Sequence, residues 1–176
     1  ERTRMGAASG YVIGWSLAGS SVHKVWPFVD AVVARVLLNH PHAHIVFVGG
    51  DTTVLLEQGW FKVTEAGTPE RDELGNKRQV DPRVHCRSGD WPIRQTMAFS
   101  LQADLVIGPE TGVLNGVCQE MMPKIVFLSH STHENLTRDW VNTFAASAEH
   151  TKCPGRGDNA APACHQLHYN WTHCQQ

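Results

Sequence analysis

The chain has 176 residues, of which 41% are hydrophobic and 18% are charged. A domain typically contains about 100–200 residues, so this length predicts a single domain with a real core. There are 15 Lys and Arg residues against 17 Asp and Glu, a net charge of −2, which excludes a strongly basic nucleic-acid-binding protein. No apolar run approaches the roughly 18–20 residues of a membrane helix, so we expect no membrane span.

The first residues of the chain indicate whether it is part of a longer protein, and its cysteines indicate the redox compartment in which it folds. The sequence begins at Glu1 and shows no basic-then-apolar leader, so we interpret it as a piece of a longer protein. It contains five cysteines, an odd number that argues against a complete disulfide framework. We therefore expect a reducing, cytoplasmic setting.

Strand-like and helix-like segments alternate through the first half of the chain. Residues 11–15 form an apolar run, followed by a Gly/Ser-rich stretch at 16–21. Pro27 suits the first turn of a helix whose apolar residues recur at helical spacing until His40 and Pro41 end it. Next come a strand over 45–48, a short helix over 52–58 and a polar surface loop over 63–82.

The second half continues the alternation. Residues 84–86 are a weak strand candidate, and residues 92–102 predict a helix. A strand at 105–107 leads into a Gly-Pro-Glu-Thr-Gly turn at 108–112, and a helix then extends to about residue 121. The last predicted strand is 125–128, and the tail from residue 151 is rich in Pro, Gly, Cys and His.

This pattern indicates βαβ units and therefore a parallel sheet. We predict an α/β fold, a Rossmann-like doubly wound parallel sheet of about five to six strands with helices on both faces. The sheet domain spans residues 1–150, and a Cys/His-rich tail at 151–176 packs on it or extends from it. Ligands of such sheets lie beyond the carboxyl ends of the strands, where the loops 16–24, 49–51, 86–91, 108–112 and 129–133 meet.

Two of these loops have the chemistry of an anion site. In the first loop, Ser20 and Ser21 offer hydroxyls and Lys24 offers a positive charge, which suit a phosphate group. In the fourth, Thr111 can cap a helix whose first N–H groups, starting at Gly112, attract an anion, and Glu110 can accept hydrogen bonds from sugar hydroxyls. Each loop alone is equally well an ordinary polar turn before a capped helix, but two at one edge favour a shared anion site.

Two further residues suit a nucleotide. Asp51 follows a strand and a Gly-Gly turn, where an acidic side chain can hold ribose hydroxyls, although it also suits a helix N-cap. Trp91 precedes Pro92 and can border a base, although a Trp at a helix start more often packs against the sheet.

Two other kinds of site are weaker alternatives. Ser16 lies in a sequence similar to a hydrolase nucleophile elbow, with Asp104 and His130 following in the order of an α/β-hydrolase triad, but no helix signal begins at the serine. The tail offers thiols and imidazoles for structural zinc, although their spacing fits no standard finger, and one disulfide with a free thiol is an equally good interpretation of its cysteines. The candidate zinc ligands are Cys153, Cys164, His168 and Cys174.

The sequence resembles family 9 glycosyltransferases, which include the heptosyltransferases of lipopolysaccharide synthesis. The resemblance rests on residues 16–27 (SLAGSSVHKVWP) with their Lys-Trp-Pro turn, on the strand and Gly-Gly-acid turn at 45–51, and on residues 103–112 (ADLVIGPETG). These segments keep the order and spacing of the family over roughly residues 11–130. Glu110 stands where the family has Asp, and Asn115 lies near the place of its usual His.

The resemblance implies the C-terminal, donor-binding half of an inverting GT-B transferase that needs no metal or other cofactor. Its substrate would be a nucleotide-diphospho-sugar, and its partners a glycan acceptor and the N-terminal half of the same parent chain, which would supply the general base. The fragment alone would then bind the donor without catalysing transfer. A non-catalytic nucleotide- or phosphate-binding module is the alternative function.

The resemblance also assigns roles to single residues. It implies that Lys24 and Glu110 act in catalysis, stabilising the leaving group and the sugar. The diphosphate would lie among Ser20, Ser21, Lys24, Thr111 and Gly112. Asp51 would hold the ribose and Trp91 would border the base.

Overall fold

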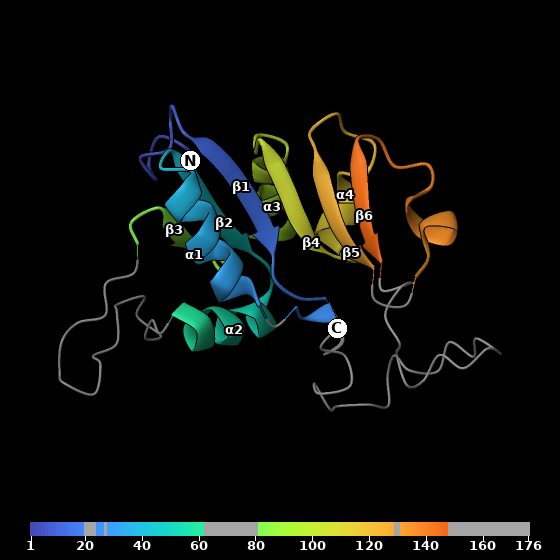
Figure 1. Cartoon of the computed structure of the whole chain (residues 1–176), viewed down its shortest axis with the longest axis horizontal. Helices are drawn as coiled ribbons and strands as arrows, with labels where there is room; N and C mark the ends of the chain where they lie inside the picture. The colour runs from blue at the N-terminus through green and yellow to red at the C-terminus, as the bar shows by residue number, and fades with distance from the viewer. Residues whose placement is uncertain (20–23, 27, 62–80, 129–130, 148–176) are drawn as a thin grey trace.

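The computed structural model describes residues 1–19, 24–26, 28–61, 81–128 and 131–147, and the side chains of residues 52 and 59–61 are not described. Six strands and their connecting helices alternate within these ranges (Figure 1). In chain order the elements are β1 (Tyr11–Ser16), α1 (Val29–Asn39), β2 (Ala43–Val48), α2 (Asp51–Phe61), β3 (Val84–Cys86), α3 (Ile93–Ser100), β4 (Leu105–Pro109), α4 (Gly112–Gly116), β5 (Lys124–Leu128), η2 (His133–Thr137) and β6 (Thr143–Ser147).

All six strands lie in one sheet in the order β3-β2-β1-β4-β5-β6, and every pairing is parallel. The chain builds outward from β1 to β3, returns to place β4 beside β1, and then builds outward in the other direction. The predicted Rossmann-like sheet is therefore confirmed. The order reverses between β1 and β4, and at such a switch point the flanking loops diverge and leave room for a ligand.

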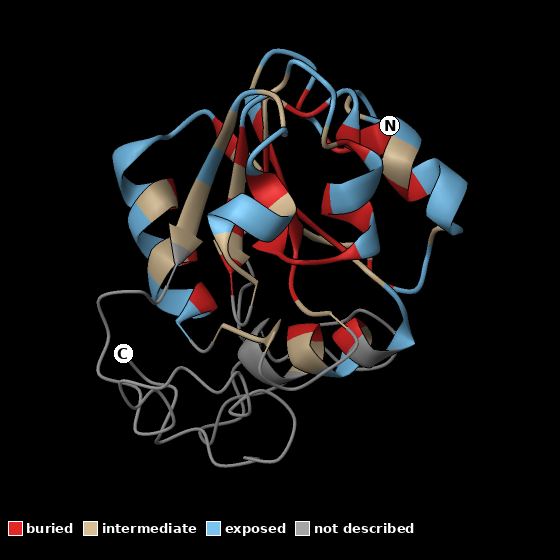
Figure 2. Ribbon diagram, turned by 90° about the vertical axis from the view of Figure 1, so that its right-hand side faces the viewer, coloured by how far each residue is buried: buried red, intermediate tan, exposed pale blue. Residues whose placement is uncertain are grey.

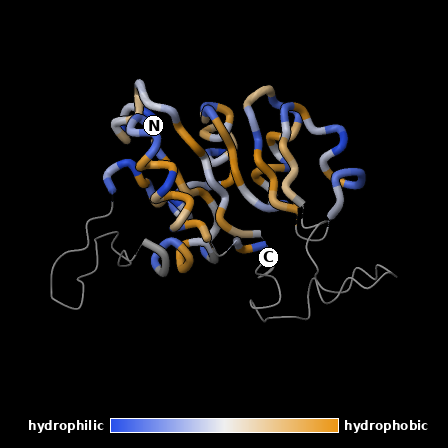
Figure 3. Tube along the Cα trace, viewed as in Figure 1, coloured by the Kyte–Doolittle hydropathy of each residue, from blue (hydrophilic) through white to orange (hydrophobic). Residues whose placement is uncertain are grey.

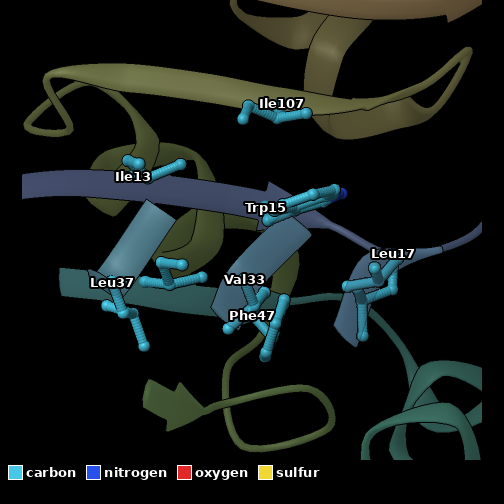
Figure 4. Close-up of a cluster of buried hydrophobic side chains, with 9 residues drawn as sticks. Ile13, Trp15, Leu17, Val33, Leu37, Phe47 and Ile107 are labelled. Atoms are coloured by element: carbon cyan, nitrogen blue, oxygen red, sulfur yellow. The ribbon is translucent and has the colours of Figure 1, made fainter. Parts of the chain in front are cut away.

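One face of the sheet is covered by α1. Val29, Val33 and Leu37 recur every four residues along α1, so they lie on one stripe of the helix and are all buried. They pack against Ile13 and Trp15 of β1, as well as Phe47 and Ile107 of the neighbouring strands (Figure 4). This packing fixes the direction of β1 and therefore the position at which the loop after β1 begins.

The other face is covered by α3 and α4, which lie behind the sheet in Figure 1. Alternate strand residues, such as Val12 and Val106, point to this face because side chains alternate along a strand. Val12 packs with Phe99 of α3, and Val106 packs with Leu114 of α4. Both faces of the central strands are thus buried, as Figure 2 shows, and the strands are accordingly continuous apolar runs (Figure 3).

Some elements differ from their predictions. The first helix begins at Val29, whereas Pro27 lies outside the described residues. Helix α4 ends at Gly116 instead of near residue 121, because i to i+3 bonds from Val117 to Leu114 and from Cys118 to Asn115 replace the helical pattern. Strand β6 was not predicted at all, since the short sequence Thr-Phe-Ala-Ala-Ser is only weakly apolar and pairs on one side alone.

Gly108 lets the end of β4 approach β1 closely. A Cβ at this position would lie 2.8 Å from the backbone oxygen of Ser16 and 3.0 Å from Leu114. Because a backbone oxygen in a paired strand cannot move aside, any side chain here forces β1 and β4 apart at the switch point. By contrast, a Cβ at Gly112 would meet nothing within 4 Å.

We predict that Gly108→Ala lowers the free energy of unfolding by about 1–3 kcal/mol, the usual cost of overpacking. The matched substitution Gly112→Ala should leave it unchanged or raise it by up to about 1 kcal/mol, because Ala is the better helix former. Urea unfolding of both variants measures the difference. Equal stabilities for the two variants would contradict the close approach of β1 and β4.

Candidate functional site

The loops after β1 and β4 meet at the carboxyl edge of the sheet. The Lys24 ammonium donates to the backbone oxygen of Glu110 at 3.0 Å, and it lies 3.9 Å from the carboxylate oxygen Oε2 of the same residue. The two side chains are only 15% and 4% exposed. Residues 86 positions apart in the sequence thus form one largely buried charged contact at the switch point.

Glu110 also joins a third loop to this contact. Its other carboxylate oxygen, Oε1, accepts a hydrogen bond from the backbone N–H of Ser131, at 3.1 Å. Ser131 comes shortly after β5. A buried carboxylate is costly unless it is paired and hydrogen-bonded, and here it has both an ammonium and an N–H donor. Glu110 therefore links the loops that follow β1, β4 and β5.

An aromatic cluster holds the chain beside Lys24. Trp26 stacks on Trp15 with ring centroids 6.2 Å apart, and it lies 5.1 Å from the ring of Phe127. Trp15 belongs to β1 and Phe127 to β5, so Trp26 is packed against two strands. A second contact restricts Lys24 itself, because its side chain folds against Gly19, where a Cβ would approach the Lys24 stem too closely.

Thr111 caps α4, as its position in the sequence predicts. Its hydroxyl accepts from the N–H of Leu114 at 3.4 Å, and the residue is 8% exposed. Gly112 is exposed at the first position of the helix. However, α4 has only five residues, so its dipole is smaller than the predicted helix would have supplied, and an anion at this corner would depend more on the charge of Lys24.

Asp51 and Trp91 lie on the loops after β2 and β3. Asp51 is exposed and belongs to the first turn of α2, and a Cβ on Gly89 would lie 3.7 Å from its Oδ1. The ring of Trp91 is half-buried and packs on Phe99, with centroids 5.0 Å apart. Asp51 thus lies beside the loop that leads to Trp91. The ring of Trp91 itself packs against the core.

Glu57 is a buried acid that sequence reasoning missed. It lies on α2, is 3% exposed, and accepts a hydrogen bond from the N–H of Ser88 at 3.1 Å. Burial is the main cause that raises the pKa of Glu57 from 4.5 to about 7, while its hydrogen bonds with Ser88 act in the opposite direction. The only sequence signal was its spacing of four from Thr53, which places both polar residues on the buried side of α2.

The alternative hydrolase triad, which would pair Ser16 with Asp104, is not formed. Asp104 precedes β4 and accepts hydrogen bonds from Arg2 at 2.9 Å and from the N–H of Val12 at 2.8 Å, at the amino end of β1. Ser16 is the last residue of β1, four residues further along a strand that rises about 3.3 Å per residue. The two side chains are therefore at opposite edges of the sheet, and Asp104 serves to anchor the N-terminal segment.

Several predicted residues lie outside the described residues. They are Ser20, Ser21 and His130, together with the candidate zinc ligands Cys153, Cys164, His168 and Cys174. Within the described ranges, no three or more His, Cys, Asp or Glu side chains are grouped so as to hold a metal ion. Nor does any helix in the described part of the chain have the length and apolar character to cross a membrane.

The sequence matches no protein-family profile and no curated protein, but the fold matches solved structures. The glycosyl transferase family 9 protein from Veillonella parvula DSM 2008 superposes with a TM-score of 0.62 and 13% identity, covering 80% of this chain and 36% of that one. The fold is that of one half of a GT-B glycosyltransferase.

A second structure agrees. The ADP-heptose lipopolysaccharide heptosyltransferase II of E. coli superposes with a TM-score of 0.59 and 10% identity, covering 79% of this chain and 39% of that one. At the level of the fold, the resemblance inferred from the sequence motifs is confirmed. The chain spans well under half the length of either glycosyltransferase.

Glu57 should make folding stability depend on pH. Its pKa is higher in the folded protein than the ordinary value of 4.5, so the folded state holds the proton more tightly than the unfolded chain. The stability contributed by this proton is therefore present at low pH and is lost as the pH rises from 4.5 through about 7. The full loss is about 3 kcal/mol, at roughly 1.4 kcal/mol for each pH unit.

We predict that Glu57→Gln removes this dependence. Relative to wild type, the variant should gain up to about 3 kcal/mol in its free energy of unfolding between pH 5 and pH 8. Urea unfolding at both pH values measures the change. The control is Glu120→Gln, which alters an exposed carboxyl and should follow wild type. Parallel pH profiles for wild type and Glu57→Gln would contradict the assignment.

Proposed function

We propose that this chain is the donor-binding domain of an inverting, heptosyltransferase-like glycosyltransferase acting in glycan or lipopolysaccharide-type synthesis. The observation that carries the proposal is the contact of Lys24 with Glu110, because it brings the two anion-suited loops to the switch point of the sheet. The donor is a nucleotide-diphospho-sugar, and its diphosphate lies at this corner. The likeness to family 9 structures supports the proposal through the fold.

Lys24 keeps capacity for a phosphate while it contacts Glu110. An ammonium has three N–H donors, and one of them is used by the backbone oxygen of Glu110. The carboxylate, at 3.9 Å, is beyond ordinary hydrogen-bond length and acts mainly through its charge. In this proposal the other two donors bind diphosphate oxygens, with the hydroxyls of Ser20, Ser21 and Thr111 and the N–H of Gly112 as further partners.

In this proposal catalysis depends on stabilising the leaving group. As the sugar departs, negative charge grows on the diphosphate, and the ammonium of Lys24 offsets it in a partly buried site. Glu110 orients Lys24 and faces the sugar, Asp51 holds the ribose, and Trp91 borders the base. The acceptor and the general base belong to the N-terminal half of the parent enzyme, so this domain alone binds the donor without turnover.

Calorimetry with ADP, UDP and GDP tests the proposal on the isolated chain. At least one of them should bind, and Lys24→Met should weaken its binding about tenfold or more, the effect of losing a charge-assisted contact worth about 1.5–3 kcal/mol. Because Lys24→Met leaves the Glu110 carboxylate without its ammonium, the double variant Lys24→Met/Glu110→Gln is measured alongside, with thermal unfolding as a folding check. The control is Arg35→Met, which removes an exposed positive charge on α1.

Both Lys24 variants should bind weakly while Arg35→Met binds like wild type. Binding that is unaffected by loss of Lys24 would contradict the site. If nucleoside diphosphates bind but the corresponding nucleotide sugars do not, the chain is a nucleotide-binding module instead.

In the complete parent enzyme, Lys24→Ala should lower turnover by more than about tenfold, corresponding to roughly 1.4 kcal/mol or more of lost transition-state stabilisation. The measurement is the rate of nucleoside diphosphate release with the acceptor present. Unchanged turnover would contradict the role of Lys24 in leaving-group stabilisation.

A further inference from the structure

The loop between β3 and α3, residues 87–92, is held from two sides at the carboxyl edge of the sheet. On one side it continues the pairing with β2, because the N–H of Arg87 donates to Phe47 at 3.1 Å and the N–H of Gly89 donates to Gly49 at 3.0 Å. On the other side, the N–H of Ser88 donates to the buried carboxyl group of Glu57 on α2. These bonds fix the backbone at three consecutive residues of the loop, Arg87, Ser88 and Gly89.

The same loop borders the place proposed for the nucleotide. Gly89 approaches Asp51, the residue proposed to hold the ribose, and its positive φ of 79° gives the loop a conformation that a side chain would strain. Two residues further on, Trp91 packs on α3. Because Ser88 is the residue next to Gly89, its position determines how the loop places Gly89 beside Asp51.

We propose that Glu57 is a positioning residue of the nucleotide site, which holds the 87–92 loop in its binding conformation through the hydrogen bond from the Ser88 N–H. This inference rests on the proposed function, because the loop matters only if a nucleotide binds beside it. Glu57 itself is 3% exposed and is placed under the loop, so it acts through Ser88.

The surroundings of Glu57 act on its pKa in both directions. Burial, the largest cause, and Asp90 favour its uncharged form, whereas hydrogen bonds with Ser88 and Cys86 favour its charged form. Asp90 on the same loop repels a negative charge at Glu57, and the Cys86 thiol of β3 is the other titratable group beside it. Burial, with Glu57 as a further cause, raises the pKa of Cys86 to about 12, so the thiol carries no charge near neutrality. Arg87 has its guanidinium paired with Asp90 at 3.3 Å, on the exposed side of the loop.

The consequence is a loop that loosens as Glu57 ionises. With the loop in place, the pKa of Glu57 is about 7, and opening the loop to water would return it toward 4.5. A rise in pH therefore favours the open loop by linkage, and the binding conformation becomes less populated. The affinity for a nucleoside diphosphate should fall from pH 6 to pH 8 in wild type.

Two substitutions separate this role from a purely structural one. Glu57→Gln keeps an oxygen to accept from Ser88 but cannot ionise, so it should bind the best nucleoside diphosphate like wild type at pH 6 and severalfold more tightly than wild type at pH 8. Glu57→Leu keeps the bulk but leaves the Ser88 N–H unpaired, so it should bind several times more weakly at both pH values. Because the phosphate of the ligand titrates in this range too, the readout is the ratio of variant to wild-type affinity at each pH.

A ligand-free measurement accompanies the binding data. In ¹⁵N-labelled protein, the amide resonance of Ser88 should shift with a midpoint near pH 7 in wild type and Glu120→Gln, and should not titrate in Glu57→Gln. Equal affinity ratios at pH 6 and pH 8, or a Ser88 amide that does not respond to pH, would overturn the inference while leaving the proposed function intact. Absence of nucleotide binding at every pH would overturn the proposed function and the positioning role together.

Discussion

The buried contact between Lys24 and Glu110 is the interaction on which the site depends. It exists because the chain returns from β3 to lay β4 beside β1, so that the two loops leaving these strands share one corner. Gly108 makes the approach close, and Trp26 packs against two strands to hold the first loop in place. If β4 did not lie beside β1, Lys24 and Glu110 would be far apart, and neither charge would have the other to compensate its burial.

The contact also explains why a charged pair is retained in an otherwise apolar fold. A buried ion pair contributes little to stability, since desolvation offsets most of the attraction. Here the carboxylate of Glu110 reaches the loops after β1 and β5, and among the described residues the ammonium of Lys24 donates one hydrogen bond, to Glu110. An arrangement that stabilises little but presents fixed donors at a switch point is suited to binding an anion.

Much of the fold could be predicted from the sequence because its strands are short apolar runs and its helices have regular spacing. The parallel sheet follows from the alternation of such runs, as with residues 45–48 and the stripe of Val29, Val33 and Leu37. Strand β6 could not be predicted, since an edge strand with one pairing partner needs little apolar character. The early end of α4 depends on turns after Gly116 that local propensity does not determine.

The candidate site was predictable only in outline. The rule that ligands lie beyond the carboxyl ends of parallel strands indicated which loops converge, and Lys24 and Glu110 do meet there. Glu57 escaped detection because a single Glu in a short helix is ordinarily exposed, and its burial results from the loop after β3 folding over α2. Asp104 precedes β4 whereas Ser16 ends the parallel strand β1, so sequence order alone already places the two residues at opposite edges of the sheet and disfavours the hydrolase triad.

A crystal structure of the chain with a bound nucleoside diphosphate tests the central claim most directly. The account predicts the diphosphate at the corner between β1 and β4, with phosphate oxygens within hydrogen-bond distance of the Lys24 ammonium and the first N–H groups of α4. A diphosphate bound at another edge of the sheet, away from the Lys24 ammonium, would contradict it.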